Sequence, residues 1–115
     1  MRTVIAGGRN VFDPKILEEA IANCGWTITT VLCGGATGAD YLGKKWAEAN
    51  NIPVEEFVAD WATYSRAAGM HRNAQMAESA DALIALWDSE SKGTANMLTN
   101  ARRCNLKIHV HLIKD

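Results

Sequence analysis

The chain has 115 residues, the size of one domain, so we expect residues 1–115 to form a single domain with no second one. Apolar residues make up 48% of it and charged residues 22%, a balance that supports a buried core and argues against disorder. The 12 basic and 13 acidic residues give a net charge of -1, so nucleic acid is not expected as the main partner.

Membrane and secretion signals are not expected in this chain. It has no apolar run of about 18 residues, and its N-terminus is too short for a signal-peptide apolar region. The three cysteines, Cys24, Cys33 and Cys104, lack the spacing of a metal site and suit a reducing compartment. We therefore expect a cytoplasmic protein, in which Cys33 is a small buried residue rather than a nucleophile.

Short β-rich runs alternate with amphipathic helical stretches along the chain. The best-marked helix start is Asp13 followed by Pro14, because aspartate caps helix N-termini and proline suits the first turn. A polar, aromatic loop is expected at 59–65. In chain order the pattern predicts a strand at 3–6, a helix at 14–24, a strand at 29–33, a helix at 38–50, a strand at 53–58, a helix at 67–79, a strand at 81–87, a helix at 93–104 and a strand at 106–113.

Five strands alternating with four helices are typical of an α/β fold with a mostly parallel sheet. Ligands of such folds bind beyond the carboxyl ends of the strands, so the loops after the first four strands form the candidate site. These loops carry glycine, arginine, acidic or tryptophan residues. The candidate ligand-binding residues are Gly7, Gly8, Arg9, Gly34, Gly35, Ala36, Gly38, Asp40, Asp60, Trp61, Arg72, Asn73, Gly93 and Thr94.

Glycines at these strand ends predict a phosphate-binding cradle. They let backbone N–H groups approach an anion closely, and the helix behind each loop presents its positive end. A purely conformational interpretation stays open, because glycine also serves positive φ angles and tight packing.

Charged and aromatic side chains at the same edge have two interpretations each. Arg9 and Arg72 either pair with phosphate through a bidentate guanidinium or form surface and structural ion pairs. Asp40 either complements the dipole of the helix that it begins or holds a ribose hydroxyl. Trp61 and Trp87 offer aromatic faces for a base, whereas Trp87 alternatively covers the end of the sheet.

Common phosphate and metal motifs are absent. Residues 34–38 lack the dinucleotide spacing, and the G-x-x-x-x-G-K match at 38–44 is followed by Lys45 instead of Ser or Thr. His109 and His111 share a strand face without a third ligand, so a solvated last strand is expected there. Neither a metal nor another cofactor is expected.

Several short motifs occur together over nearly the whole chain. They are Gly7-Gly8-Arg9, Gly34-Gly35-Ala36, Gly38-Ala39-Asp40, Ala59-Asp60-Trp61, Ala68-Gly69, Arg72-Asn73, Met76, Ala80-Asp81 and Gly93-Thr94. In combination they resemble the YspA/YpsA-related SLOG family, which is frequent in bacteria and phages and includes the Lonely Guy phosphoribohydrolases and DprA among its wider relatives. The resemblance implies a Rossmann-like three-layer sandwich that binds nucleotides or nucleotide-derived ligands at its glycine loops.

One position departs from the Lonely Guy pattern. Those enzymes carry a catalytic Glu two residues after their Gly-Thr, and here Asn96 stands at that position after Gly93-Thr94. An amide cannot act as a general base or stabilise a cationic transition state as a carboxylate does. N-glycosidic hydrolysis would then require a carboxylate from elsewhere, such as Asp88 or Glu90.

The leading prediction is a protein that binds a nucleotide or nucleotide-derived small molecule in order to sense, sequester or process it. One alternative is a nucleoside-monophosphate N-glycosidase, and another is a single-stranded nucleic-acid binder like the DprA relatives. A structural subunit, whose glycine turns are only turns, is the remaining alternative. The four tryptophans suggest that copies pair through a helix face to form a homo-oligomer.

Overall fold

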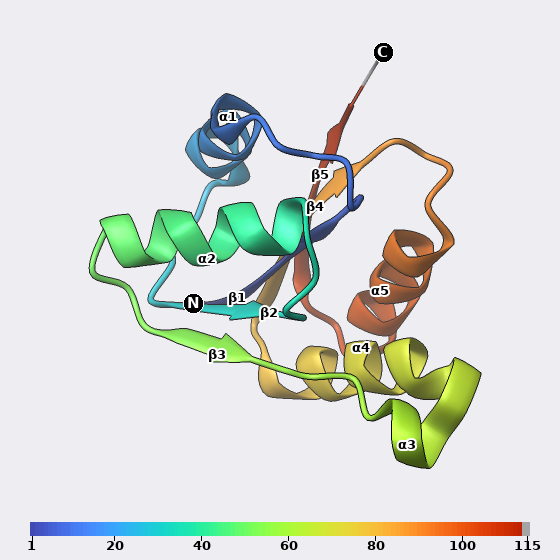
Figure 1. Cartoon of the computed structure of the whole chain (residues 1–115). Helices are drawn as coiled ribbons and strands as arrows, with labels where there is room; N and C mark the ends of the chain where they lie inside the picture. The colour runs from blue at the N-terminus through green and yellow to red at the C-terminus, as the bar shows by residue number, and fades with distance from the viewer. Residues whose placement is uncertain (114–115) are drawn as a thin grey trace.

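The computed structural model describes residues 1–113, which contain one five-stranded sheet with helices on both faces (Figure 1). The strands are β1 (Arg2–Gly7), β2 (Thr30–Cys33), β3 (Val54–Glu56), β4 (Ala82–Trp87) and β5 (Lys107–Leu112). The helices are α1 (Pro14–Cys24), α2 (Ala39–Ala49), α3 (Trp61–Tyr64), α4 (Ala68–Ser79) and α5 (Lys92–Arg103). All strand pairs are parallel, in the order β3-β2-β1-β4-β5, so the predicted α/β sandwich is confirmed.

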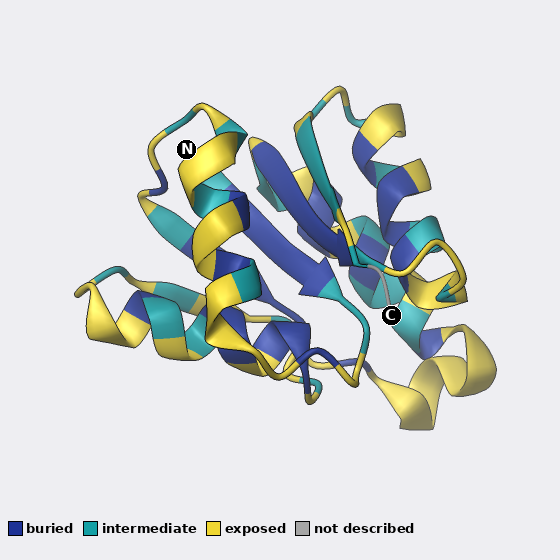
Figure 2. Ribbon diagram, turned by 90° about the horizontal axis from the view of Figure 1, so that it is seen from above, coloured by how far each residue is buried: buried dark blue, intermediate teal, exposed yellow. Residues whose placement is uncertain are grey.

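Each face of the sheet is covered by its own pair of helices (Figure 1). On one face, Leu17 of α1 and Leu42 of α2 pack with Ile5 of β1. On the other face, Met76 of α4 and Leu98 of α5 belong to a second core. The central strands are therefore almost wholly buried, as the dark ribbons of Figure 2 show, and their apolar runs follow from this double coverage.

Local sequence signals set both ends of α1 as predicted. The Asp13 carboxylate accepts a hydrogen bond from the Lys15 backbone N–H at 3.0 Å, directly before Pro14. Gly25 ends the same helix with a φ of 90°, a conformation that favours glycine. Within residues 1–113, no helix is long and apolar enough to cross a membrane.

The segment predicted as a loop at 59–65 is instead largely helical. Asp60 caps the short α3, and a 3-10 turn over Ser65–Ala67 joins it to α4. The prediction was wrong because a four-residue helix buries no side chain and so leaves no apolar periodicity to read. In Figures 1 and 2, α3 projects from the body as an exposed turn beside α4.

The prediction of a solvated β5 holds only in part, because both of its histidines are half-buried. The Nε2 atom of His109 is buried and has no hydrogen-bond partner among the described residues. β5 is an edge strand, but α1 packs against it and covers that side. This face of β5 is therefore covered in part, and no residue of the strand is fully buried.

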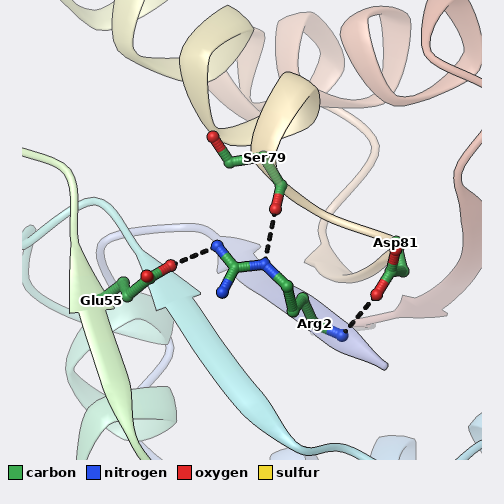
Figure 3. A network of polar contacts seen from close by, with 4 residues as sticks. All are labelled: Arg2, Glu55, Ser79 and Asp81. Carbon is green, nitrogen blue, oxygen red and sulfur yellow. Dashed lines mark hydrogen bonds and ion pairs between the residues drawn. The ribbon is translucent and has the colours of Figure 1, made fainter.

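A polar network ties the amino ends of the strands together, opposite the candidate site (Figure 3). The Arg2 guanidinium pairs with Glu55 of β3 and donates through Nε to the Ser79 carbonyl at 2.8 Å. The Arg2 backbone N–H donates to the Asp81 carboxylate at 2.9 Å. One residue thus joins β1, β3 and the end of α4, which leaves the carboxyl edge free of this bracing.

Candidate functional site

The loops after β1 and β2 pack directly against each other at the carboxyl edge of the sheet. The Gly8 carbonyl accepts a hydrogen bond from the Ala39 N–H at 3.1 Å, at the start of α2. Gly38 has a φ of 77°, and a Cβ there would lie 2.4 Å from the Gly8 oxygen and 2.5 Å from the Arg9 backbone. Only glycine suits this contact, so the two loops form one rigid unit.

Asp40, in the first turn of α2, is the carboxylate that the loop after β2 surrounds. It is only 9% exposed, and its Oδ2 accepts the Ala36 backbone N–H at 3.1 Å. Burial raises the pKa of Asp40, whereas the Ala36 N–H and the nearby Arg72 and Arg9 charges act in the opposite direction. The Ala36 N–H, predicted to meet a ligand, is therefore already used by the chain's own carboxylate.

Arg72 reaches from α4 to the same loop. Its Nη1 donates to the Gly34 carbonyl at 2.8 Å, and a Cβ on Gly34 would lie 2.7 Å from Nη1 and 2.9 Å from the Asp40 carboxylate. Its Nε is buried without a hydrogen-bond partner among residues 1–113. In that part of the chain neither Arg72 nor Arg9 forms an ion pair within 4.0 Å. Two guanidinium groups thus act on one buried carboxylate at this edge.

A cleft of about 210 Å³ adjoins Arg72 on the side of α3. Its aromatic wall is formed by Tyr64 and His71, whose ring centroids lie 3.9 Å apart at an interplanar angle of 47°. Sequence reasoning missed both residues, although His71, Arg72 and Gln75 share helical spacing with Ala68 and so lie on one face of α4. The full lining is Val58, Asp60, Tyr64, Ala68, His71, Arg72 and Gln75.

Of the two candidates after β3, Asp60 lines this cleft and Trp61 does not. The Asp60 Oδ1 accepts the Thr63 backbone N–H at 3.1 Å, and hydrogen bonding to Thr63 lowers the pKa of Asp60. Trp61 is 58% exposed, and its ring reaches the start of α4, where a Cβ on Gly69 would lie 4.0 Å from it. Inside the cleft the aromatic surface comes from Tyr64 and His71, and the ligand contact of Trp61 stays a prediction.

The predicted residues Asn73, Gly93 and Thr94 lie at the packing contact between α4 and α5. Asn73 is 7% exposed, and its amide donates to the Gly93 carbonyl at 3.2 Å and to the Asn96 side-chain oxygen at 3.0 Å. Thr94 is 3% exposed, and its hydroxyl donates to Ser91. These side chains hold the start of α5 in place, and only the Gly93 backbone faces outward.

The remaining candidates have conformational or packing roles that the structure shows directly. A Cβ on Gly7 would lie 2.3 Å from the Leu86 carbonyl, and Gly35 has a φ of 75°. Trp87 donates through Nε1 to the Ser91 carbonyl at 3.2 Å, at the end of β4. Burial raises the pKa of the Cys33 thiol to about 11, which keeps it protonated and poorly nucleophilic.

The model of the YspA, cpYpsA-related SLOG family matches residues 1–64, which include the loops after β1 and β2 and the whole of α3. The chain belongs to this family. It is 32% identical over 84 residues to the "Gene 61 protein" of Mycobacterium phage D29, a match that covers 68% of this chain and 67% of the relative. No solved structure shows a match.

In this SLOG protein, Asn96 is engaged in an amide ladder. Its side-chain oxygen accepts hydrogen bonds from the amides of Asn73 at 3.0 Å and Asn100 at 3.2 Å. An amide oxygen that accepts two hydrogen bonds has both of its lone pairs in use. Among residues 1–113, no three His, Cys, Asp or Glu side chains are grouped so as to hold a metal ion.

A second hollow of the SLOG protein lies between α1 and α2. It encloses about 430 Å³, and its lining includes Leu17, Leu42 and Trp46, with Glu18 and Lys45 among the polar residues. None of the sequence-predicted site residues lines it. It is the larger hollow, but the arginines and the glycine loops belong to the edge beside α4.

Proposed function

We propose that this SLOG protein binds a nucleotide or nucleotide-derived small molecule at the carboxyl edge of its sheet. The observation that carries the proposal is the arrangement of Arg72. Its guanidinium is held by Gly34, has a buried donor without a partner, and borders a cleft with an aromatic wall. A phosphate beside Arg72 and Arg9 would meet paired cationic donors, and the base would lie in the cleft.

The electrostatics of the edge support an anionic ligand. The whole chain carries a net charge of -1, so a phosphate is not attracted by a general field. The attraction is local, because Arg9 and Arg72 act on a single carboxylate whose pKa is already raised by burial. Two cationic side chains at one small site suit a small phosphorylated ligand better than a long nucleic acid.

The residues at this edge support binding of the nucleotide without hydrolysis of its N-glycosidic bond. The side-chain oxygen of Asn96 already accepts a hydrogen bond from the Asn73 amide. The Oδ1 atom of Asp88 accepts the backbone N–H groups of Glu90 and Ser91, each at 2.8 Å. Cys24, Cys33 and Cys104 are all free thiols, which supports a reducing, cytoplasmic setting. The homo-oligomer stays a prediction.

Native mass spectrometry of the purified protein tests the proposal. Wild type, Arg72→Ala and the control Arg102→Ala, which changes an exposed arginine of α5, are each mixed with a panel of nucleoside monophosphates and dinucleotides. We expect an intact nucleotide adduct that Arg72→Ala loses and Arg102→Ala keeps. No adduct with any nucleotide, or equal adducts in all three proteins, contradicts the proposal, and accumulation of free base favours the N-glycosidase alternative.

A further inference from the structure

The guanidinium of Arg72 is fixed on one side and unpaired on the other. Its Nη1 donates to the Gly34 carbonyl at 2.8 Å, and its Nε is buried without a partner. Its Nη2 forms no hydrogen bond or ion pair with any other residue of the described chain, 1–113. Nε and Nη2 lie on one edge of the planar group, where two parallel N–H groups can hold two oxygens of one anion. The edge of Arg72 that suits bidentate binding is therefore the edge that the chain leaves unpaired.

Gly69, in the first turn of α4, lies beside this unpaired edge. A Cβ on Gly69 would lie 3.9 Å from Nη2 of Arg72 and 4.0 Å from Cη2 of Trp61. The missing side chain thus leaves a small open space, which has a guanidinium on one side and an indole ring on the other.

The fold does not require glycine at position 69. Its φ is outside the left-handed region, and the distances of 3.9 and 4.0 Å are ordinary van der Waals contacts, so alanine fits there and favours the helix. Gly43 of α2 differs, because a Cβ there would lie 3.0 Å from Ile5. Gly93 of α5 differs as well, because a Cβ there would have nothing within 4 Å. Among these helical glycines, Gly69 is the one whose missing side chain leaves space beside an unpaired cationic group.

We infer that the phosphate of the ligand lies over Gly69, against Nε and Nη2 of Arg72, and that Gly69 is a ligand-contact position. The inference rests on the proposed function and adds the place at which the phosphate is held. One phosphate oxygen at hydrogen-bond distance from Nη2 directs a second oxygen toward Nε, whose burial without a partner is otherwise unfavourable. A side chain at position 69 would compete with the phosphate for this space.

Titration calorimetry of wild type, Gly69→Ala and Gly69→Leu with AMP, GMP, CMP and UMP tests the inference. Scanning calorimetry gives the Tm of each protein. We expect Gly69→Ala to raise the Tm by about 2–4 °C, because alanine favours a helix, and to weaken nucleotide binding by about fivefold. Gly69→Leu places a longer side chain beside Nη2 and should weaken binding by at least about fiftyfold. The matched control is Thr99→Ala, which also improves helix propensity, at an exposed position of α5, and should keep the wild-type affinity.

The outcomes separate the inference from the proposed function. If Gly69→Ala or a folded Gly69→Leu binds nucleotide as tightly as wild type, the inference is overturned while nucleotide binding stands. If the Tm of Gly69→Ala falls several degrees below that of wild type, glycine serves the fold at this position and the inference is again overturned. If wild type binds none of the four nucleotides, the proposed function itself fails.

Discussion

Replacing Gly34 by alanine displaces Arg72 without blocking the fold. A Cβ at this position would lie 2.7 Å from Nη1 and 2.8 Å from Cζ of Arg72, and 2.9 Å from Oδ2 of Asp40. All three atoms belong to side chains, which can move. The φ of Gly34 is not in the left-handed region, so alanine adds no backbone strain.

The size of the effect follows from these distances. Ordinary contact begins at 3.4 Å, so Nη1 moves outward by about 0.7 Å. The 2.8 Å bond to the Gly34 carbonyl then lengthens to roughly 3.5 Å and is lost as a hydrogen bond. A charged, partly buried bond of this kind contributes about 1–3 kcal/mol, and each kcal/mol lowers the Tm by roughly 4 °C. We expect the Tm of Gly34→Ala to fall by about 4–12 °C.

Differential scanning calorimetry and AMP titration measure both consequences. Gly93→Ala is the matched control, because a Cβ there has nothing within 4 Å, and its Tm should not fall. We expect AMP binding to weaken by at least about tenfold in Gly34→Ala and to stay unchanged in Arg102→Ala, the exposed control on α5. A Gly34→Ala protein with the Tm and the AMP affinity of wild type would refute the described position of Arg72.

Further predictions concern the loops and the carboxylates. Gly38→Ala should lose about 2–4 kcal/mol in urea unfolding, because its Cβ meets the Gly8 backbone and its φ is 77°. Asp40 has a raised pKa, so the folded state holds its proton more tightly, and its contribution to stability is lost as pH rises from the ordinary value of 3.8 through the folded pKa. Asp40→Asn should therefore gain stability relative to wild type over that rise. The Ser91 and Glu90 N–H groups lower the pKa of Asp88. Its contribution to stability is therefore present at neutral pH and is lost as pH falls through its folded pKa. Asp88→Ala should be less stable than wild type at neutral pH, and the difference should vanish once the pH falls below the folded pKa of Asp88.

The fold class was readable from the sequence because its signals are local. The Asp13-Pro14 start and the Gly25 stop mark α1 at the residues where it begins and ends. The apolar sequence of β4 predicts a strand that is covered on both faces of the sheet. The strand order was not readable, because pairing depends on contacts between distant residues such as Gly7 and Leu86.

The candidate site was readable only in part. The sequence pattern placed Arg72 and Asp40 at the carboxyl edge of the sheet, where the structure has them, but it did not show which way each side chain points. Asn73 is turned into the contact with α5, where burial requires its amide to find partners. Tyr64 was missed because α3 buries no side chain and the cleft is assembled from α3, α4 and the segment that follows β3.

Amide NMR mapping of AMP binding tests the central claim most directly. ¹⁵N-labelled wild-type protein is titrated with AMP, and the shifted backbone signals are placed on the structure. We predict that the largest shifts fall at the carboxyl edge, on Gly34, Tyr64 and Arg72. Shifts confined to the hollow between α1 and α2, around Leu42 and Trp46, would place the ligand elsewhere and contradict the account. The absence of any shift at saturating AMP would contradict it as well.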